Sequence, residues 1–337
     1  MEILFGTHPK YIEHDAGSGH PEQPARLDAV LAGVEESGVR EGIGFFVPEP
    51  ATMADLHRVH DPAYVDALRR FCLMGGGQLD PDTAVSVASW DAALLAAGSG
   101  LDAVRRLRAG EASSAFLAVR PPGHHAVADR AMGFCLINNV AVTAASLVAE
   151  GEKVLIFDYD AHHGNGTQDI FYRDPNVLYV SFHQYPLYPG TGRADEVGAG
   201  AGVGTTVNIP VPAETTLGTY QAAIDEIVAP AVDAFGPTWV IASAGFDGHR
   251  DDPLTELGLT AQDFGDLTSW LFALVPRGRR IAILKGGYNL RALTLSAAST
   301  LAAMVGERLM AEKPSSGEAR IPVIRAIREA RARSLEL

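Results

Sequence analysis

The sequence predicts an α/β fold built around a parallel sheet, and two observations support this prediction. Short apolar runs typical of buried strands alternate with longer amphipathic patterns typical of helices over almost all of the 337 residues. Polar motifs follow several of these strands directly, as expected where the carboxyl ends of parallel strands form a ligand-binding edge. The length allows one large domain or two smaller ones, and composition does not separate these options.

The predicted elements follow this alternation along the chain. Strands are predicted at residues 3–6, 115–119, 154–158, 177–182, 206–209, 239–244 and 281–284. Helices are predicted at residues 24–36, 62–74, 89–108, 137–150, 217–235, 260–274 and 290–309. Ser89 and Thr260 are expected to be N-caps, and Asp263 completes an approximate capping box with Thr260. The strand at 154–158 begins with an apolar, partly β-branched run, which predicts a central strand covered on both faces.

No linker rich in proline, serine and glycine interrupts the alternation before residues 313–318. We therefore predict a single domain over residues 1–337, with a main body at 1–311 and a short helical tail at 319–337. The tail helix would place Ile324, Ile327 and Ala330 on one face. The glycine-rich stretch at 198–204 precedes a strand and lacks the Lys-Ser/Thr ending of a phosphate loop, so it is predicted to be a flexible loop.

Charge and composition narrow the classes of function. The formal net charge is -14 and the pI is about 5.2, which argues against a nucleic-acid binder and weakly favours cationic substrates. The two cysteines, Cys72 and Cys135, have no metal-ligand spacing, and the simplest interpretation is a reducing, cytoplasmic setting. No run of 18 apolar residues and no signal-peptide pattern is present, so we expect no membrane association.

The strongest motif is Asp-Tyr-Asp-Ala-His-His-Gly-Asn-Gly-Thr-Gln at residues 158–168, directly after an apolar strand. Asp160 and His162 are two positions apart, so an extended backbone places their side chains on the same side. A carboxylate with an imidazole suits zinc and other first-row divalent ions. Asp247 follows the strand at 239–244 and would be the third ligand. Three protein ligands with an open position are typical of a catalytic metal site.

Other polar residues follow strands that should end at the same edge. His124 and His125 form a tandem pair suited to proton transfer, although a lone histidine is more often structural. Asp158 and Asn165 are the natural partners to orient these two imidazoles. Tyr288 follows two glycines and could direct its hydroxyl toward a substrate carbonyl, with ordinary aromatic packing as the alternative.

These motifs together resemble the zinc-dependent histone deacetylase family. The matching strings are the 158–168 motif, Arg-Pro-Pro-Gly-His-His at 120–125, Gly-Phe-Cys-Leu-Ile-Asn-Asn at 133–139, Tyr-Pro-Gly-Thr-Gly at 188–192, Ala-Gly-Phe-Asp at 244–247 and Gly-Gly-Tyr-Asn at 286–289. Asn165 is typical of the class II branch, which includes bacterial histone-deacetylase-like amidohydrolases and acetylpolyamine amidohydrolases. The resemblance covers nearly the whole chain. It implies the arginase-deacetylase fold, with three α/β/α layers and a mostly parallel central sheet of about eight strands.

The resemblance also implies roles for individual residues. Asp160, His162 and Asp247 would bind one catalytic zinc ion, and His125 would be the general base and acid, with His124 as its electrostatic partner. Tyr288 would polarise the substrate carbonyl. Substrate contacts would come from Asp82, Gly133, Phe134, Tyr188 and Leu254. A structural potassium ion would be bound by Asp158, Ser181 and the backbone carbonyls of Asp160, His162 and Phe182.

The function implied is the removal of acetyl or other short acyl groups from N-acyl-lysine side chains by a metal-activated water. Acetylpolyamine deacetylation is the alternative, since Glu256, Asp251 and Asp252 are close in sequence to the apolar Leu254. An arginase-type ureohydrolase would need carboxylates at Gly164 and His249 for a second metal. A non-catalytic acyl-lysine-binding homologue is the more distant option. The natural substrate, the acyl length, the oligomeric state and the pathway stay open at the level of sequence.

Overall fold

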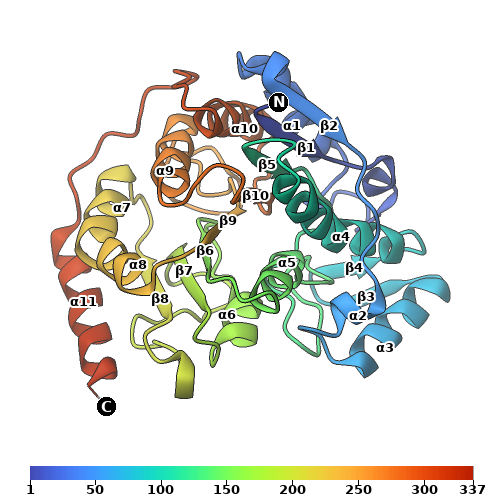
Figure 1. Ribbon diagram of the computed structural model, residues 1–337, viewed down its shortest axis with the longest axis horizontal. Helices are drawn as coiled ribbons and strands as arrows, with labels where there is room; N and C mark the ends of the chain where they lie inside the picture. The colour runs from blue at the N-terminus through green and yellow to red at the C-terminus, as the bar shows by residue number, and fades with distance from the viewer. Residues whose placement is uncertain (337) are drawn as a thin grey trace.

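A computed structural model describes residues 1–336 as an eight-stranded sheet with helices on both faces. The strand order is β2-β1-β5-β10-β9-β6-β7-β8, and every neighbouring pair is parallel. Figure 1 shows the strands crossing the middle of the molecule between two groups of helices. The predicted three-layer architecture with about eight strands is therefore confirmed.

All strands predicted from the sequence are present, and three further strands were missed. The main sheet contains β1 (Ile3–Gly6), β2 (Ile43–Phe46), β5 (Ser114–Leu117), β6 (Val154–Asp158), β7 (Val177–Gln184), β8 (Thr206–Val211), β9 (Trp239–Ala244) and β10 (Arg280–Leu284). The edge strand β2 is short and partly exposed, so it lacks a clear apolar period. The antiparallel hairpin of β3 (Gly77–Asp80) and β4 (Thr83–Val85) begins with polar residues and stands outside the main sheet.

Helices α1 (Ala25–Glu36), α9 (Ala261–Ala273) and α10 (Leu290–Met304) pack together on one face. The other face carries α4 (Ser89–Arg108), α5 (Asn139–Val148) and the short α6 (Asn165–Phe171), as Figure 1 shows. The remaining helices are α2 (Met53–Leu56), α3 (Pro62–Leu73), α7 (Leu217–Ala223), α8 (Ala229–Phe235) and α11 (Ile321–Leu335).

Several predicted boundaries were wrong. The helix expected at 217–235 is interrupted by a π-helical stretch at Ile224–Val228, just before Pro230, which has no N–H to donate. The helix expected to reach residue 309 ends at Met304, with Gly306 in the left-handed region at φ 87°. Residues 200–202 of the glycine-rich stretch form a 3-10 turn.

Of the two predicted helix caps, one is present and one is not. Thr260 is the N-cap of α9, and its N–H donates to Asp263 Oδ2 at 2.9 Å. The N-cap of α4 is Ala88, so the prediction for Ser89 was wrong. The Ser89 hydroxyl lies 2.7 Å from His14 Nδ1 and accepts the N–H of Ser86. A tertiary contact therefore uses the group that the sequence pattern assigned to the cap.

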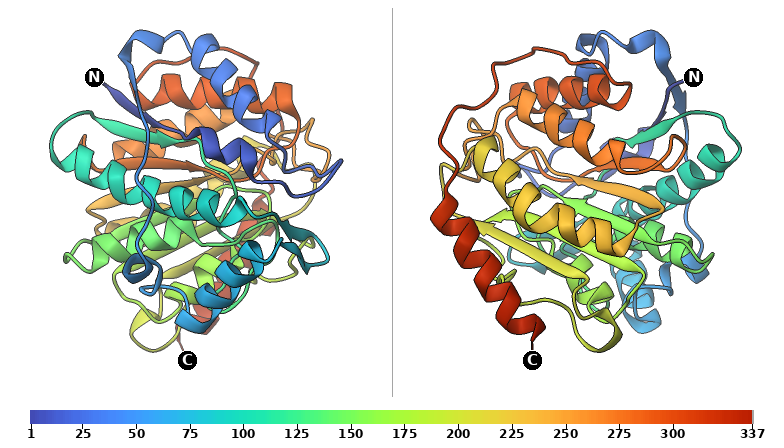
Figure 2. Two further views of the ribbon diagram at one scale, coloured as in Figure 1. Left: turned by 90° about the vertical axis from the view of Figure 1, so that its right-hand side faces the viewer. Right: turned by 60° about the vertical axis from the view of Figure 1, so that its left-hand side comes forward.

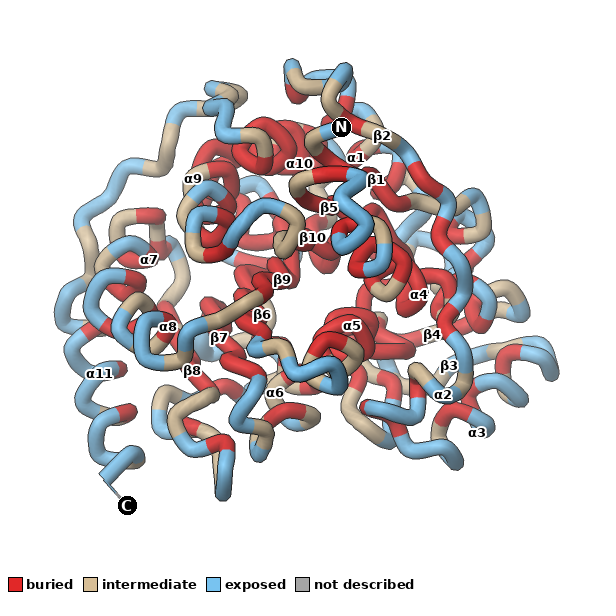
Figure 3. Tube along the Cα trace, in the orientation of Figure 1, coloured by how far each residue is buried: buried red, intermediate tan, exposed pale blue. Residues whose placement is uncertain are grey.

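The core follows the sheet, and its central strands are buried on both faces (Figure 3). Asp158 is buried at the carboxyl end of β6, where a carboxylate is costly without a partner. At the far edge, α11 packs beside α7 and β8, as the right view of Figure 2 shows, and Ile324 and Ile327 of α11 are buried. Within residues 1–336, no helix combines the length and apolar character that a membrane span requires.

Candidate active site

The predicted metal ligands lie together at the carboxyl edge of the sheet. Asp160 and His162 follow β6, and Asp247 follows β9, which is the neighbour of β6. Their ligand atoms lie within 4.8 Å of one another. His162 Nδ1 is 3.2 Å from Asp160 Oδ1 and 2.9 Å from Asp247 Oδ2. Both carboxylates are buried, so the three side chains form a polar cluster enclosed by protein.

Backbone donors fix the orientation of the two carboxylates. The N–H of Gly286 donates to Asp160 Oδ2 at 2.8 Å, and the N–H of Ala161 donates to Asp247 Oδ1 at 2.8 Å. The glycine is required sterically, because a Cβ on Gly286 would lie 2.2 Å from Asp247 Oδ2 and 2.7 Å from Asp160 Oδ2.

The electrostatics of the cluster favour a bound cation. Burial, followed by the charge of Asp160, raises the pKa of Asp247 to about 7. Burial opposes a charge on His162, but its hydrogen bonds and charge interactions with Asp160 and Asp247 raise its pKa to about 10. Two buried carboxylates and one imidazole with converging donor atoms therefore fit a divalent ion of the zinc type.

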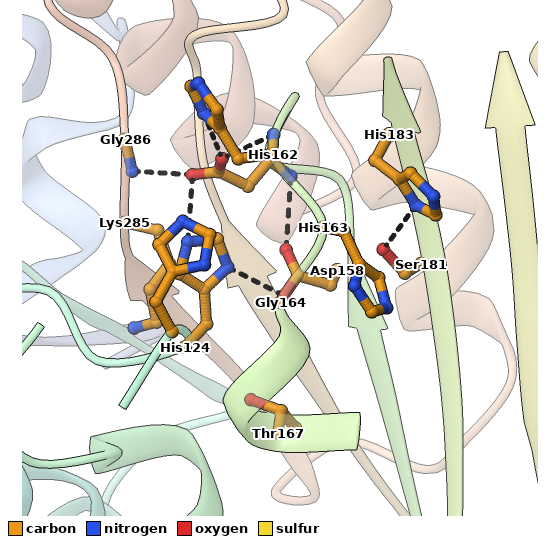
Figure 4. Close-up of polar contacts among 12 residues, drawn as sticks. His124, Asp158, His162, His163, Gly164, Thr167, Ser181, His183, Lys285 and Gly286 are labelled. Carbon is orange, nitrogen blue, oxygen red and sulfur yellow. Dashed lines mark hydrogen bonds and ion pairs between the residues drawn. The ribbon is translucent and has the colours of Figure 1, made fainter. Parts of the chain in front are cut away.

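Each histidine of the tandem pair has the hydrogen-bond partner expected from the sequence. His124 Nδ1 lies 3.0 Å from Asp158 Oδ2, and His125 Nδ1 lies 2.8 Å from Asn165 Oδ1. Figure 4 shows the first of these contacts at the end of β6. The two imidazole centroids are 4.0 Å apart. Neighbouring rings with different partners can hold different protonation states.

The two histidines differ in their affinity for a proton. Burial opposes protonation of His124, but the charges of Asp160 and Asp158 raise its pKa. Burial and then the charges of His124 and His162 hold the pKa of His125 well below the usual range. Because the oxygen of Asn165 accepts from Nδ1–H of His125, the Nε2 of His125 carries the free lone pair. His125 therefore binds a proton less tightly than His124, but it is neutral and its Nε2 lone pair is available to accept one.

A cavity of about 260 Å³ opens onto these groups. It is lined by the five predicted substrate residues and four others, namely Asp82, His125, Gly133, Phe134, His162, Leu187, Tyr188, Leu254 and Tyr288. Leu187 was missed because an isolated leucine in a loop has no motif. A larger cavity of about 400 Å³ is lined in part by Asn165 and by none of the three predicted metal ligands.

One wall of the cavity is held by the β3–β4 hairpin. The N–H of Phe134 donates to Thr83 Oγ1 at 3.0 Å, and the N–H of Gly133 donates to Asp82 Oδ1 at 3.2 Å. Phe134 has a φ of 66°, which is unusual for a bulky residue and is typical of functionally constrained positions. The His20 ring packs edge-on against Phe134, with 4.5 Å between centroids.

Tyr288 lies at the cavity between Phe134 and Arg26. Its ring packs edge-on against Phe134 at 5.9 Å, and the guanidinium carbon of Arg26 is 5.0 Å from the ring centroid. Its backbone N–H donates to Asp252 Oδ2 at 2.7 Å. Burial raises the pKa of Tyr288 well above its usual value, so the hydroxyl retains its proton and can donate a hydrogen bond.

The residues implied in potassium binding lie beside the histidine pair. Asp158 and Ser181 face each other in the β6–β7 register. The hydroxyl of Ser181 is 3.0 Å from Nδ1 of His183, as Figure 4 shows. The side chain of Phe182 stacks on Tyr220 with 4.6 Å between centroids, so only its backbone is free for a polar role.

A buried ion cluster behind the site had been assigned no role from the sequence. Glu22 accepts from Arg120 Nε at 2.5 Å and from Arg26 at 3.0 Å. Arg26 also donates to the backbone oxygens of Lys285 and Gly287, directly before Tyr288. The position of Arg120 directly after a buried strand was a sequence signal for a role near the site. Its pairing with Glu22 could not be predicted, because the two residues are about 100 positions apart.

Lys285 is another buried charged residue to which the sequence analysis assigned no role. Its ammonium is fully buried and donates to Asn139 Oδ1 at 2.7 Å. Burial lowers its pKa to about 7. Figure 4 shows Lys285 near His124. A lysine at the end of an apolar strand was the signal that could have identified it.

The position where an arginase-type enzyme would carry a further carboxylate is sterically closed. A Cβ on Gly164 would lie 2.5 Å from both Asp158 Oδ2 and the Tyr179 hydroxyl, and 3.2 Å from His124 Nδ1. Asp158 and Tyr179 therefore occupy the space that a carboxylate side chain at this position would need.

Comparison with known proteins agrees with this geometry. The histone deacetylase domain family matches residues 20–304. The chain belongs to the histone deacetylase family. This family member is 41% identical over 319 residues to a probable deacetylase of Archaeoglobus fulgidus, covering 92% of this chain and 87% of that protein. It is 34% identical over 285 residues to a histone deacetylase-like amidohydrolase of Pseudomonas aeruginosa, covering 83% of this chain and 75% of that protein.

The fold of this histone deacetylase family member also matches a solved structure. The crystal structure of the HDA15 HD domain superposes with a TM-score of 0.90 and 37% sequence identity. The match covers 99% of this chain and 96% of that chain. The arginase-deacetylase fold expected from the sequence is confirmed, and the family supports a hydrolase of the deacetylase kind.

Proposed function

We propose that the chain is a zinc-dependent deacylase that removes acetyl or other short acyl groups from N-acyl-lysine side chains. The observation that carries this proposal is the meeting of three kinds of group at one cavity. His162 of the metal-ligand cluster, the proton-accepting His125 and the hydrogen-bond donor Tyr288 all line it. This combination is what hydrolysis of an amide requires, since water must be deprotonated while the carbonyl oxygen gains negative charge.

Asp160, His162 and Asp247 would hold one zinc ion, which when bound supplies Lewis acidity at the base of the cavity. In this mechanism, Nε2 of His125 takes the proton of the attacking water. The hydroxyl of Tyr288 donates a hydrogen bond to the carbonyl oxygen as it becomes negative. A histidine of the pair then returns a proton to the leaving amine, and His124 remains oriented by Asp158.

Removal of metal is the direct test of this function. Incubation with a strong chelator is expected to abolish hydrolysis of a fluorogenic acetyl-lysine amide, and one equivalent of zinc should restore it. Metal analysis should find one catalytic divalent ion per chain. Chelator-resistant product release would contradict the zinc mechanism, and two divalent ions would reopen the ureohydrolase alternative. A protein that binds acyl-lysine but releases no product would be a non-catalytic homologue.

Substitution of Gly286 by Ala is expected to weaken zinc binding at least roughly 10-fold, because the new Cβ would displace the carboxylates of Asp160 and Asp247. Titration of zinc against a chromogenic chelator measures this change. Gly42→Ala is the matched control, since a Cβ there meets only ordinary contacts at 3.7 Å or more. Equal zinc affinity in the two variants would mean that this cluster does not bind the metal.

The structure favours lysine over polyamine substrates. Asp252 is close in sequence to Leu254 of the cavity lining. Its carboxylate, however, accepts the backbone N–H groups of Tyr288 and Leu254. Glu256 is 3.4 Å from the amide of Gln184, and neither acid lines the cavity. Leu187 and Leu254 are apolar members of the cavity lining, and apolar surface there suits an aliphatic lysine stem.

A comparison of three substrates tests this preference. Turnover of an acetyl-lysine peptide is expected to exceed that of acetylputrescine, and a longer acyl-lysine would report the length of acyl chain that the cavity accepts. Faster turnover of acetylputrescine would make polyamine deacetylation the main activity.

The proposed potassium site at Asp158, Ser181 and the carbonyl of Phe182 is supported by their proximity along β6 and β7. The expected substrate is an acylated lysine on a protein or peptide, or an acetylated small amine.

A further inference from the structure

The segment between α10 and α11 lies beyond the part of the chain that matches the histone deacetylase domain, which ends at residue 304. Figure 1 shows it running from α10 past α9 to α11. One of its side chains, Glu312, reaches the loop that follows β9. Glu312 Oε2 is 2.7 Å from His249 Nε2 and accepts the N–H of Ala261 at 2.9 Å. Its other oxygen accepts from the guanidinium of Arg250 at 3.0 Å.

His249 is buried, and both of its ring nitrogens are engaged. Nδ1 accepts the N–H of Asp251 at 3.1 Å, so Nε2 carries the hydrogen and donates it to Glu312. Although His249, Asp251 and Glu312 lie close enough together to resemble a metal site, neither imidazole nitrogen is free to bind an ion. The cluster is therefore a polar clamp, and its strongest bond is to a carboxylate.

The loop held by this clamp, residues 247–255, contains the proposed metal ligand Asp247 and contacts the backbone of Tyr288. It begins at Asp247, whose backbone oxygen accepts the hydroxyl of Thr255. The N–H of Asp252 donates to the oxygen of His249 at 2.9 Å. The carboxylate of Asp252 in turn accepts the N–H of Tyr288 at 2.7 Å. His249 is therefore linked through a few bonds to a proposed metal ligand and to the backbone of the tyrosine.

The segment that carries Glu312 is itself fixed in place. The N–H of Ser315 donates to Asp263 Oδ1 at 3.1 Å, and the hydroxyl of Ser315 accepts the N–H of Leu217 at 3.0 Å. Glu312 is therefore anchored to the starts of α9 and α7. A carboxylate on an anchored segment can restrain the loop that it contacts, whereas a carboxylate on a freely moving segment could not.

We infer that Glu312 is a positioning residue that acts through His249 and Arg250 to hold the loop carrying Asp247 and supporting Tyr288. A segment beyond residue 304, where the match to the histone deacetylase domain ends, thereby helps to set zinc affinity and turnover. This inference rests on the proposed function for the roles of Asp247 and Tyr288. Removal of Glu312 leaves the buried donor of His249 without its partner and the loop without its restraint.

The test compares Glu312→Ala and Glu312→Gln with Glu307→Ala, whose exposed side chain lies in the same segment. Zinc affinity is measured by competition with a chromogenic chelator, and loop mobility by hydrogen exchange at the amides of residues 250–252. We expect Glu312→Ala to bind zinc roughly 10-fold more weakly, with faster exchange and a lower kcat at saturating zinc. KM should change less than kcat, because Glu312 does not line the cavity. Glu312→Gln retains one acceptor oxygen, so its zinc affinity, exchange rate and kcat should lie between those of the wild type and the alanine variant.

Zinc affinity and hydrogen exchange equal to those of Glu307→Ala would overturn the inference. If the alanine variant does not fold, the glutamine variant carries the same comparison. Neither measurement depends on turnover, so failure of the clamp is distinguishable from failure of the proposed function. A wild-type protein that binds zinc but hydrolyses no acyl-lysine refutes the function alone, whereas an active enzyme insensitive to Glu312→Gln and Glu312→Ala refutes the clamp alone.

Discussion

Substitution of Tyr288 by Phe is expected to lower kcat by about 100- to 1,000-fold, the usual cost of losing one donor to a developing oxyanion. The hydroxyl lies in a buried environment that keeps it protonated, and it is the group at the cavity best suited to donate to the carbonyl oxygen. The phenylalanine ring would retain the packing against Phe134 and Arg26. Steady-state kinetics on an acetyl-lysine peptide measure the effect.

Two controls make the result for Tyr288 specific. Zinc content and zinc affinity of Tyr288→Phe should equal those of the wild type, because the hydroxyl is not among the proposed ligands. Tyr185→Phe, in an exposed tyrosine of the loop before Tyr188, should leave kcat unchanged. Unchanged turnover in Tyr288→Phe would remove the tyrosine from the mechanism.

Glu22→Gln is expected to lower the free energy of unfolding by about 3–5 kcal/mol, the usual effect of removing one partner from a buried ion pair. Arg120 and Arg26 both donate to Glu22, and all three side chains are fully buried. A neutral amide would leave two guanidinium groups uncompensated in the interior. Denaturant unfolding measures the change, and Glu49→Gln, at an exposed position, is the control.

The effect of Glu22→Gln should depend on pH in a defined direction. Burial raises the pKa of Glu22, but the charges and hydrogen bonds of Arg120 and Arg26 outweigh it and lower the pKa from 4.5 to about 2. A depressed carboxyl pKa contributes stability that is present above pH 4.5 and is lost as the pH falls toward 2. The difference between wild type and variant should therefore shrink in that window. A constant difference from pH 7 to pH 3 would contradict the ion-pair explanation.

The regular part of the fold was predictable because burial imposes a period on the sequence. The strands β6 and β9 are apolar over nearly their whole length because helices cover both faces of the sheet. Strand β2 and the β3–β4 hairpin lack that signal because they are short and partly exposed. The break between α7 and α8 was missed, although Pro230, which has no backbone N–H to donate, lies inside the helical pattern.

The residues at the strand ends were also predictable, because polar groups after buried strands gather at one edge. The hydrogen bonds from His124 to Asp158 and from His125 to Asn165 are present as expected. Leu187 could not be found, since a cavity wall is defined by shape. Glu22 and Lys285 were assigned no role, because their partners Arg120 and Asn139 lie far away in the sequence and only folding brings them together.

The sequence alone determined the parallel sheet and the positions of the candidate ligands, because apolar runs mark the strands and the loops after parallel strands share one edge. It also pointed to Gly164 as the position that distinguishes this chain from an arginase-type enzyme. Tertiary structure decided why a side chain is not accommodated there, since Asp158 and Tyr179 occupy the space. It also brought Glu22 to Arg120 and Glu312 to His249, pairs joined only by folding. Contacts between distant segments depend on three-dimensional packing, and a single sequence carries no local period that records them.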